Sequence, residues 1–302
     1  MNGSDERLFD SRQVRRAFGR AAAGYDRASP IQREIESRLL ESLDHWTIRH
    51  GDDAPGVVVD VGCGPARAAH ALRARWPKAR VIAIDAALPM LHAAETNTRG
   101  HFLRQREIAR VAGDLRMLPL ASDSVDLLFC NLALQWIEDL PAAFAEFRRV
   151  MRPGGLLLAT TFGSQTLINL REAFEVADAV PHVSPFTAIG PFGDALVAAG
   201  FREPVLDRDV FIEHKSDFAD ILKALRAMGA TNALHARRHA LSGRSRFSAA
   251  EAAHAREERG YPMRWEAIYA QAWAPEPGTP MRDAGGETAH VPLARIPIRR
   301  RG

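Results

Sequence analysis

The spacing of apolar residues along this chain changes near residue 56. From Gln13 to Leu43 they recur at helical intervals, with an interruption at Ala28-Ser29-Pro30, which predicts an entry helix and then a second helix. A polar linker that contains proline and glycine follows at 52–56. Beyond it, short apolar runs alternate with longer amphipathic stretches. This order predicts a helical segment that precedes an alternating α/β domain.

Seven of the later runs predict β-strands. The first five are apolar on both faces and are separated by helical stretches, as in a parallel sheet covered by helices on each side. A helix ending at Gly200 precedes the sixth run, and a helix over 218–228 and a polar stretch over 232–260 precede the seventh. The runs lie at 57–61, 81–84, 109–112 (the weakest pattern), 125–130, 156–161, 204–212 and 264–273.

These elements predict an α/β fold with a Rossmann-like, doubly wound, mostly parallel seven-stranded sheet. The length suits one large domain with additions rather than two independent cores. We expect a helical lid from the N-terminus at 1–50 and a main domain with helical insertions at 51–275. We expect a disordered basic tail at 276–302, where proline, glycine and arginine accumulate.

Charge does not indicate a nucleic-acid partner. The sequence pI is 9.2, but the tail carries five arginines against three acids, which leaves only +1 of the total net charge of +3 for the rest of the chain. No apolar stretch approaches the roughly 18 residues of a membrane span. The charged N-terminus lacks the apolar core of a secretory signal. We therefore expect a cytoplasmic protein with neither a nucleic-acid nor a membrane partner.

The two cysteines do not indicate a disulfide framework or a metal site. Cys63 and Cys130 have no histidine or cysteine at metal-ligand spacing near them, and both fall in or beside predicted strands. Small buried residues are the expected role for both.

A glycine loop after the first strand predicts a ligand site. Val57 to Val61 ends in Gly62-Cys63-Gly64, and a helix follows. Such a loop lies at the carboxyl end of a strand, where doubly wound sheets bind ligands. A dinucleotide site would place a third glycine at Arg67, and a Walker loop would need Gly-Lys-Ser/Thr, which is absent. Asp60, just before the loop, can organise it and attract a cationic ligand group.

Two further acids extend this pattern. Asp85 ends the second strand, where it can accept hydrogen bonds from two ribose hydroxyls, and Asp114 follows the third strand, where it can accept from an adenine amino group. Met90 lies in a segment that can cover one face of an adenine. The ordered set over 57–161 resembles the class I methyltransferases, which implies S-adenosylmethionine as co-substrate. The expected cofactor-binding residues are Asp60, Gly62, Gly64, Asp85, Met90, Asp114, Leu115 and Asn131. Many members of the class have a glycine at the position of Ala66.

A narrower resemblance covers nearly all of Val14 to Trp273. It rests on Val14-x-x-Ala17-Phe18-x-x-Ala21-Ala22-x-x-Tyr25-Asp26, on Asn131 to Trp136, on Leu170-Arg171-x-Ala173-Phe174 and on Ala227 to Asn232. These segments resemble the malonyl methyltransferases of biotin synthesis. The resemblance implies a malonyl thioester on acyl carrier protein, or on coenzyme A, methylated at its free carboxylate.

Methyl transfer to a carboxylate agrees with the absence of an obvious acid–base pair, because a carboxylate with a pKa of about 4 is already ionised. The resemblance implies that Arg171 grips that carboxylate and that Tyr25 closes over the methyl group. Gln135 and Trp136 are expected to line the pocket. In place of a polar Asp-Met-His group that the family usually shows, this chain has Ala188-Ile189-Gly190.

Two basic clusters are candidates for docking an acidic carrier protein. One comprises Arg12, Arg15, Arg16 and Arg20, and the other runs from His235 to His239 with Arg244 and Arg246. Three alternatives remain open at this point. They are a methyltransferase of another small carboxylic acid or amide, a hydroxylase and assembly factor of respiratory complex I related to this family, and a nicotinamide oxidoreductase, which Arg67 disfavours.

Overall fold

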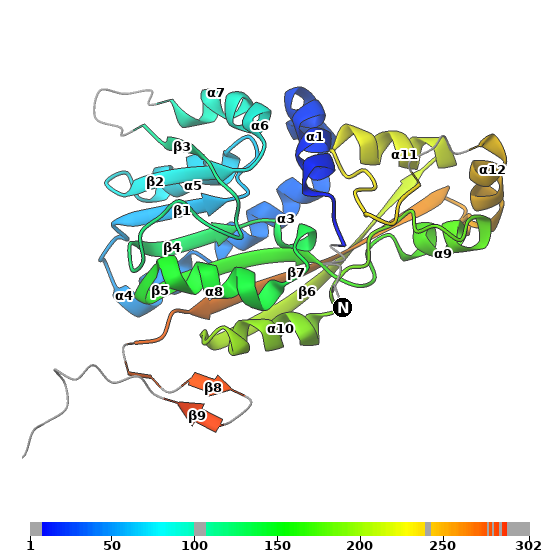
Figure 1. Ribbon diagram of the computed structural model, residues 1–302. Helices are drawn as coiled ribbons and strands as arrows, with labels where there is room; N and C mark the ends of the chain where they lie inside the picture. Colours follow the sequence, from blue (N-terminus) through cyan, green and yellow to red (C-terminus); the bar gives the residue numbers. More distant parts are fainter. Residues whose placement is uncertain are drawn as a thin grey trace, which may run out of the picture.

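The computed structural model describes residues 8–99, 107–238, 243–276 and 278–279, and the backbone of 281–283 and 286–288. Its centre is a seven-stranded sheet of order β3-β2-β1-β4-β5-β7-β6 (Figure 1). Within this sheet β7 is antiparallel to both of its neighbours, and the other neighbouring pairs are parallel. The mostly parallel seven-stranded sheet is therefore confirmed. The strands are β1 Val57–Val61, β2 Arg80–Asp85, β3 Ala109–Ala112, β4 Val125–Cys130, β5 Met151–Phe162, β6 Arg202–Lys215 and β7 Tyr261–Trp273.

Alternate strand residues build two cores, one on each face of the sheet. Val59 and Leu128 pack toward α8 (Leu140–Val150) and α10 (Ile189–Ala198). Val58 and Leu127 pack on the other face, against α3 (Pro30–Glu41), α4 (Asp44–His50) and α5 (Arg67–Arg75). This period of two is why the first strands are apolar throughout.

The switch point of the sheet lies between β1 and β4. The chain runs from β1 outward to β2 and β3, then returns to place β4 on the other side of β1. The carboxyl ends of β1 and β4 therefore diverge into loops that leave a crevice. Short helices α6 (Leu88–Ala93) and α7 (Glu95–Thr98) follow β2 beside this edge.

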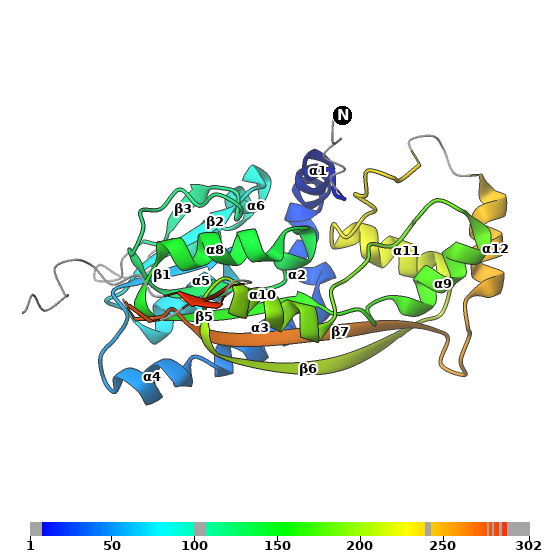
Figure 2. The same cartoon turned by 60° about the horizontal axis from the view of Figure 1, so that its bottom comes forward.

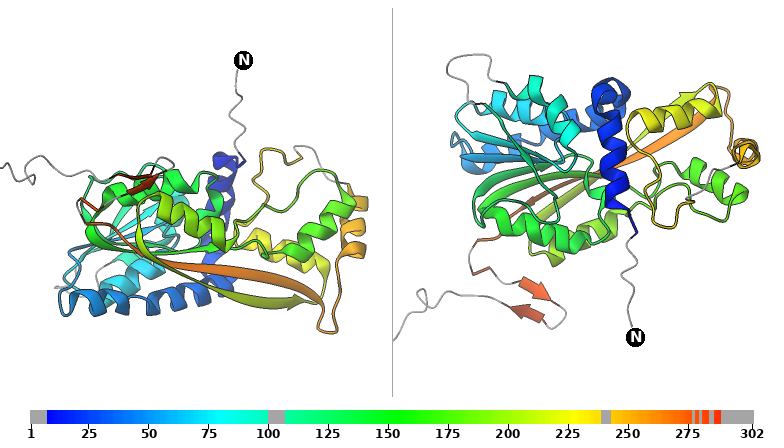
Figure 3. Two further views of the ribbon diagram at one scale, coloured as in Figure 1. Left: turned by 90° about the horizontal axis from the view of Figure 1, so that it is seen from below. Right: turned by 45° about the horizontal axis from the view of Figure 1, so that its top comes forward.

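The N-terminal segment crosses that edge. It forms α1 (Ser11–Ala21), the 3-10 turn η1 (Ala22–Gly24) and α2 (Tyr25–Ala28) before α3. Asp10 caps α1, because its side chain accepts hydrogen bonds from the Arg12 and Gln13 amides. Figure 3 shows α1 standing between the β1–β4 half of the molecule and α11. Among the described residues of the predicted lid, α1, η1 and α2 lie over the edge, whereas α3 and α4 contribute Leu39 and Trp46 to the core.

The last two strands of the main sheet extend beyond the other five. Figure 2 shows β6 and β7 running under the molecule to a helical group made of α9 (Ile168–Ala177), α11 (Phe218–Ala227) and α12 (Arg244–Ala253). A third core, which includes Phe162, Phe174, Ile221 and Trp265, joins these helices to the strands. The polar stretch over 232–260 did not predict α12. No helix in the described ranges is long and apolar enough to cross a membrane.

The segment predicted to be a disordered tail contains paired backbone in its described part. Strand β8 (Met281–Asp283) pairs antiparallel with β9 (Gly286–Thr288) in a separate two-stranded sheet. The sequence reading did not anticipate this pairing. Its prediction for 289–302 lies outside the described residues.

Close packing at Gly229 joins α11 to α1. Gly229 follows α11 with φ +77°, and a Cβ built on it would lie 2.9 Å from Phe18 Cδ1 and 3.2 Å from Phe18 Cα. Only glycine accepts both the left-handed backbone and this approach at low cost. The end of α11 is thus held directly against α1.

Replacement of Gly229 by alanine is expected to destabilise the protein by about 2 kcal/mol or more, since it adds backbone strain to overpacking. Urea unfolding of Gly229→Ala measures this loss. The matched control is Gly24→Ala, because Gly24 has negative φ and no atom within 4 Å of the built Cβ. Equal unfolding midpoints for the two variants would contradict the account of the α1–α11 contact.

Candidate active site

The glycine loop after β1 is held by the next strand and leaves room above it. Gly62 and Cys63 donate their amide hydrogens to the Ile84 carbonyl at 2.8 and 3.0 Å. Gly62 has φ +70°, and a Cβ on it would lie 2.5 Å from Ala133 Cβ. Ala66 has φ 60° at the start of α5, a left-handed conformation that costs an alanine about 1 kcal/mol. The loop is therefore fixed, and it borders a pocket at the switch point.

Two of the predicted acids hold the loop and the helix α5 that follows it. Asp85 accepts the Gly64 amide at 2.9 Å and the Ala87 amide at 2.7 Å, one on each carboxylate oxygen. Each oxygen keeps a second lone pair, so Asp85 can still accept ribose hydroxyls. Asp60 is only 2% exposed and accepts the Ala69 amide at 3.0 Å, in the first turn of α5. Burial raises the pKa of both carboxyl groups.

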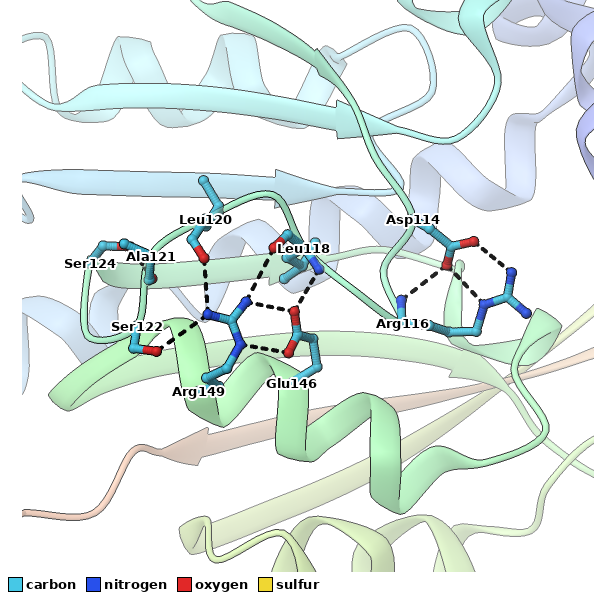
Figure 4. Close-up of polar contacts among 9 residues, drawn as sticks. All are labelled: Asp114, Arg116, Leu118, Leu120, Ala121, Ser122, Ser124, Glu146 and Arg149. Atoms are coloured by element: carbon cyan, nitrogen blue, oxygen red, sulfur yellow. Dashed lines mark hydrogen bonds and ion pairs between the residues drawn. The ribbon is translucent and has the colours of Figure 1, made fainter.

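Asp114 is engaged by a residue that the sequence reading missed. Its carboxylate accepts from the Arg116 Nε at 2.9 Å and from a terminal nitrogen at 2.5 Å, while the Arg116 amide donates at 3.0 Å (Figure 4). The Arg116 hydrogen bonds lower the pKa of Asp114. In the same view, Arg149 and Glu146 on α8 fix the following loop at Leu118 and Leu120. Asp114 therefore carries a full charge at the pocket rim.

The first pocket, which we call the cofactor pocket, collects most of the predicted cofactor residues. Met90 and Leu115 supply apolar walls, and Asn131 lies at the end of β4, where its Oδ1 accepts from the Thr160 hydroxyl at 2.6 Å. This combination suits S-adenosylmethionine, because apolar walls accept the adenine while Asp85 faces the same space. The predicted residues that line the pocket are Tyr25, Gly62, Gly64, Asp85, Met90, Asp114, Leu115, Asn131 and Trp136.

Asp60 lies instead in an adjoining chamber, which we call the charged pocket. Here Asp60 meets Arg33, Glu36 and Arg67, beside Gly62 and Gly64 of the loop. Glu36 Oε1 lies 3.4 Å from Arg67 Nε. Burial raises the pKa of Glu36 to about 7, although Arg67 opposes the shift. Acids and guanidinium groups side by side complement a zwitterionic amino-acid group, such as the methionyl end of S-adenosylmethionine.

Sequence reasoning missed Arg33, Glu36 and Arg67 as site residues. Arg67 had entered only as the position that lacks a dinucleotide glycine, and the other two lie on α3, far from the loop in sequence. A signal was available in the helical spacing, because Gln32, Arg33 and Glu36 occupy neighbouring turns of one helix face.

A second pocket lies on the other side of α1 and α2; we call it the acyl pocket. Its walls are mainly apolar and come from β5, β7, α9 and α11, with Phe162, Leu170, Leu225 and Trp265 among them. The same walls carry buried polar atoms that have no hydrogen-bond partner. They are Gln32 Oε1, Gln135 Oε1, Trp136 Nε1, Thr231 Oγ1 and Trp265 Nε1. Unpaired buried polar atoms cost free energy, so their concentration in one cavity indicates a polar ligand.

The cofactor pocket and the acyl pocket meet at four residues: Phe18, Tyr25, Leu132 and Trp136. The Phe18 ring packs edge-on against Trp136 at 5.5 Å between centroids and lies 6.2 Å from Tyr25. Tyr25 also lines the charged pocket. Burial raises the pKa of Tyr25, so its phenol stays protonated and can donate a hydrogen bond. None of these four side chains is charged.

The predicted residues Gln135 and Trp136 therefore line the acyl pocket, but Arg171 lines neither it nor the cofactor pocket. The Arg171 guanidinium donates to the Ser164 carbonyl at 2.7 Å, and its Nε is buried without a partner. Its neighbour Leu170 faces the acyl pocket instead. The structure thus places Arg171 behind the wall of the pocket rather than in it.

One half-buried acid, whose side chain is only 4% exposed, organises the far side of the acyl pocket. Asp178 accepts from His182 at 3.1 Å and from Arg238 at 2.9 Å, and lies 3.3 Å from Arg246 Nε. The His182 and Arg238 hydrogen bonds hold the pKa of Asp178 well below its usual range. His182 in turn stacks on Phe174 at 4.2 Å. Arg238 and Arg246 of the second basic cluster predicted for docking therefore hold this wall, and Arg237 pairs with Asp10 at 2.8 Å, while His239 lies outside the described residues.

The cysteines take the role expected of them. Both are buried, and burial raises the pKa of each thiol. Among the described residues, no group of three histidine, cysteine or acidic side chains is placed to hold a metal ion.

The chain is similar in sequence to known methyltransferases. The methyltransferase domain family model matches residues 59–159. A malonyl-[acyl-carrier protein] O-methyltransferase of Xylella fastidiosa (strain M23) is 51% identical, over 100% of this chain and 99% of its own. One from Methylovorus sp. (strain MP688) is 40% identical, over 90% and 92%.

Solved structures agree on the fold. A Bacillus halodurans chain described as a methyltransferase superposes with a TM-score of 0.55 at 18% identity, covering 80% of this chain and 100% of its own. The YcgJ protein from Bacillus subtilis gives 0.55 at 17% identity, over 78% and 99%. The class I methyltransferase fold is therefore confirmed.

The charged pocket predicts that S-adenosylmethionine binds more tightly as the pH rises from about 6 to 8. Below a pKa of about 7, Glu36 is protonated and cannot pair with the ligand's ammonium group, so binding must release its proton. Calorimetric titrations at several pH values, in two buffers of different ionisation enthalpy, measure the affinity and the released protons.

In Glu36→Gln the dependence on pH across this range should disappear. Glu34→Gln is the matched control, because Glu34 lies on the same helix but is exposed and pairs with Arg38. If Glu34→Gln removed the pH dependence and Glu36→Gln kept it, Glu36 would not be the group that meets the ammonium.

Proposed function

Because this chain belongs to the family of the malonyl-[acyl-carrier protein] O-methyltransferases, we infer that it methylates the free carboxylate of a malonyl thioester. The methyl donor is S-adenosylmethionine, and the acceptor is carried on acyl carrier protein. The product is the malonyl methyl ester that starts pimeloyl and biotin synthesis. The observation that carries this proposal is the uncharged wall where the cofactor pocket and the acyl pocket meet.

The reaction needs alignment rather than proton transfer. S-Adenosylmethionine supplies an electrophilic methyl group on a sulfonium. A malonyl carboxylate is ionised at neutral pH, so no side chain has to remove a proton. The work left to the protein is to bring a carboxylate oxygen into line with the methyl group and to exclude water. Phe18 and Leu132 can exclude water, because they close the junction between the two pockets with apolar surface.

Neutral donors at the junction suit this charge-cancelling step. An anion and a sulfonium cation lose their charges together as the methyl group moves, so a polar environment favours the reactants over the transition state. A guanidinium on the carboxylate would also reduce its nucleophilicity. We propose that the Trp136 indole N–H and the Tyr25 hydroxyl orient the carboxylate in place of Arg171. Arg171 instead holds the loop at Ser164, to whose carbonyl it donates a hydrogen bond.

The remaining polar atoms of the acyl pocket suit the thioester and the amides that follow it. Gln135 donates its Nε2 to the Leu132 carbonyl at 2.6 Å, which leaves its oxygen as an acceptor. Thr231 can donate or accept, and the Trp265 indole can only donate. A ligand that alternates carbonyl and N–H groups would satisfy such a set, whereas a purely aliphatic acid would not.

This proposal extends to a second thioester and to a place in the cell. Malonyl-coenzyme A presents the same acyl group and the same pantetheine amides, so we include it as a substrate. We also propose that the protein works in the cytoplasm. Neither nucleic acid nor membrane has a part in the proposed reaction.

The purified enzyme with S-adenosylmethionine is expected to add the mass of one CH2 group to malonyl-carrier protein but not to acetyl-carrier protein. The reason is that only malonyl has a free carboxylate. Mass spectrometry of the intact carrier protein measures the product, with succinyl-carrier protein as a test of chain length. Modification of acetyl-carrier protein, or of no thioester while S-adenosylmethionine still binds, would overturn the assignment of the acceptor.

Replacing Trp136 by phenylalanine is expected to lower kcat/KM for the malonyl substrate about tenfold or more, because a buried hydrogen bond to a charged group is lost while an aromatic ring remains. The affinity for S-adenosylmethionine, measured by calorimetry, should change far less. Arg171→Ala is the comparison, with Arg171→Lys as its conservative partner. A larger loss in Arg171→Ala than in Trp136→Phe, with cofactor affinity intact, would return the carboxylate contact to Arg171.

A further inference from the structure

A surface groove between α1 and the end of α11 leads toward the acyl pocket. Gln13, Ala17, Arg20 and Ala21 of α1 line one side, and Arg226 and Ala227 of α11 line the other. Arg20 and Arg226 are both exposed, and neither pairs with a carboxylate among the described residues. The groove therefore presents two guanidinium groups, from two different elements, to one space.

Two residues line both this groove and the acyl pocket: Arg226 and Thr231. Thr231 lies between the groove and the acyl pocket, and its buried hydroxyl oxygen has no hydrogen-bond partner among the described residues. The tight contact between Gly229 and Phe18 fixes this passage, because it holds the turn after α11 against α1. A ligand that enters along the groove therefore passes Arg226 and Thr231 before it reaches the apolar interior of the acyl pocket.

The outer surface of α1 adds more positive charge beside the groove. Arg12, Arg16 and Arg20 recur every four residues, which places them in one stripe along the helix. All three are exposed, and α1 contains no acid. The opposite face of α1, with Val14 and Phe18, lines the cofactor pocket. One helix therefore separates a basic outer stripe from the reaction site.

We propose that this groove receives the phosphopantetheine arm of the acyl substrate, with Arg20 and Arg226 holding its phosphodiester and Thr231 hydrogen-bonding to an amide of the arm. This assignment rests on the proposed function. A phosphodiester carries the negative charge that two converging guanidinium groups bind. The arm beyond it is narrow and carries amides, which suits a passage with one buried hydroxyl. The basic stripe then lies where the acidic carrier protein that bears the arm would rest.

The test compares enzyme variants on substrates that differ in the phosphate. Wild type, Arg226→Ala and Arg20→Ala are assayed with malonyl-carrier protein, malonyl-coenzyme A and malonyl-pantetheine, which lacks the phosphate. Each arginine variant should raise KM about tenfold or more for the two phosphate-bearing substrates and much less for malonyl-pantetheine, since only the former lose a charge-assisted contact. Lys223→Ala is the matched control, because Lys223 is an exposed cation on α11 outside the groove that pairs with Asp220.

The outcomes separate this inference from the proposed function. If wild type methylates all three substrates but Arg226→Ala and Arg20→Ala raise KM equally with and without the phosphate, the phosphodiester does not bind here. An effect of Lys223→Ala as large as theirs would also overturn the proposal, since it would reflect general charge. If wild type methylates none of the three, the proposed function itself has failed. The basic stripe on α1 gives a separate prediction. Arg12→Ala and Arg16→Ala should each raise KM for malonyl-carrier protein but not for malonyl-coenzyme A, because only the carrier protein would rest on the stripe. An equal rise in KM for malonyl-coenzyme A would contradict docking of the carrier protein there.

Discussion

The packing of Phe18 between two halves of the molecule is the constraint on which the rest of the site depends. On one side its ring meets Trp136 from the loop after β4, and on the other it touches Gly229 after α11. A single helix is thereby fixed against both the Rossmann-like half and the half built on β6 and β7. The cofactor pocket and the acyl pocket acquire a shared wall because this helix closes each of them.

Charged and neutral side chains occupy different parts of the site. Acids and guanidinium groups gather in the charged pocket, and guanidinium groups alone form the outer stripe of α1, whereas the junction between the cofactor pocket and the acyl pocket has only neutral side chains. Several arginines that looked free in the sequence are instead held by Asp10 and Asp178. Asp10 neutralises Arg237, and the single Asp178 carboxylate offsets one of the two guanidinium charges that it contacts. The electrostatics of the site are therefore set as much by which arginines are paired as by which are present.

The fold and the strand-end residues that line the cofactor pocket could be predicted from the sequence because their signals are local. The strand periods, the glycine loop and the acids at or just after the ends of the first three strands can each be recognised within a few residues, and the sheet brings strand ends to one edge. Thr231 gave no such signal, and the helical spacing of Glu36 could not show what it faces, since the roles of both depend on contacts between segments far apart in the chain. Arg171 shows the same limit for a residue that the sequence did predict to lie in the site. Its position on α9 was right, but the rotation of that helix turns Leu170 toward the pocket instead.

The two long strands β6 and β7 have a consequence for how such an enzyme diversifies. They run without a break from the core of the sheet to the helices around the acyl pocket, paired along almost their whole length. Within Arg202–Lys215 and Tyr261–Trp273 no linker separates the core of the sheet from the acceptor-binding part, so a cut in either strand would expose the hydrogen bonds of both. A change of acceptor preference that keeps these two strands intact therefore acts on the side chains of the existing wall.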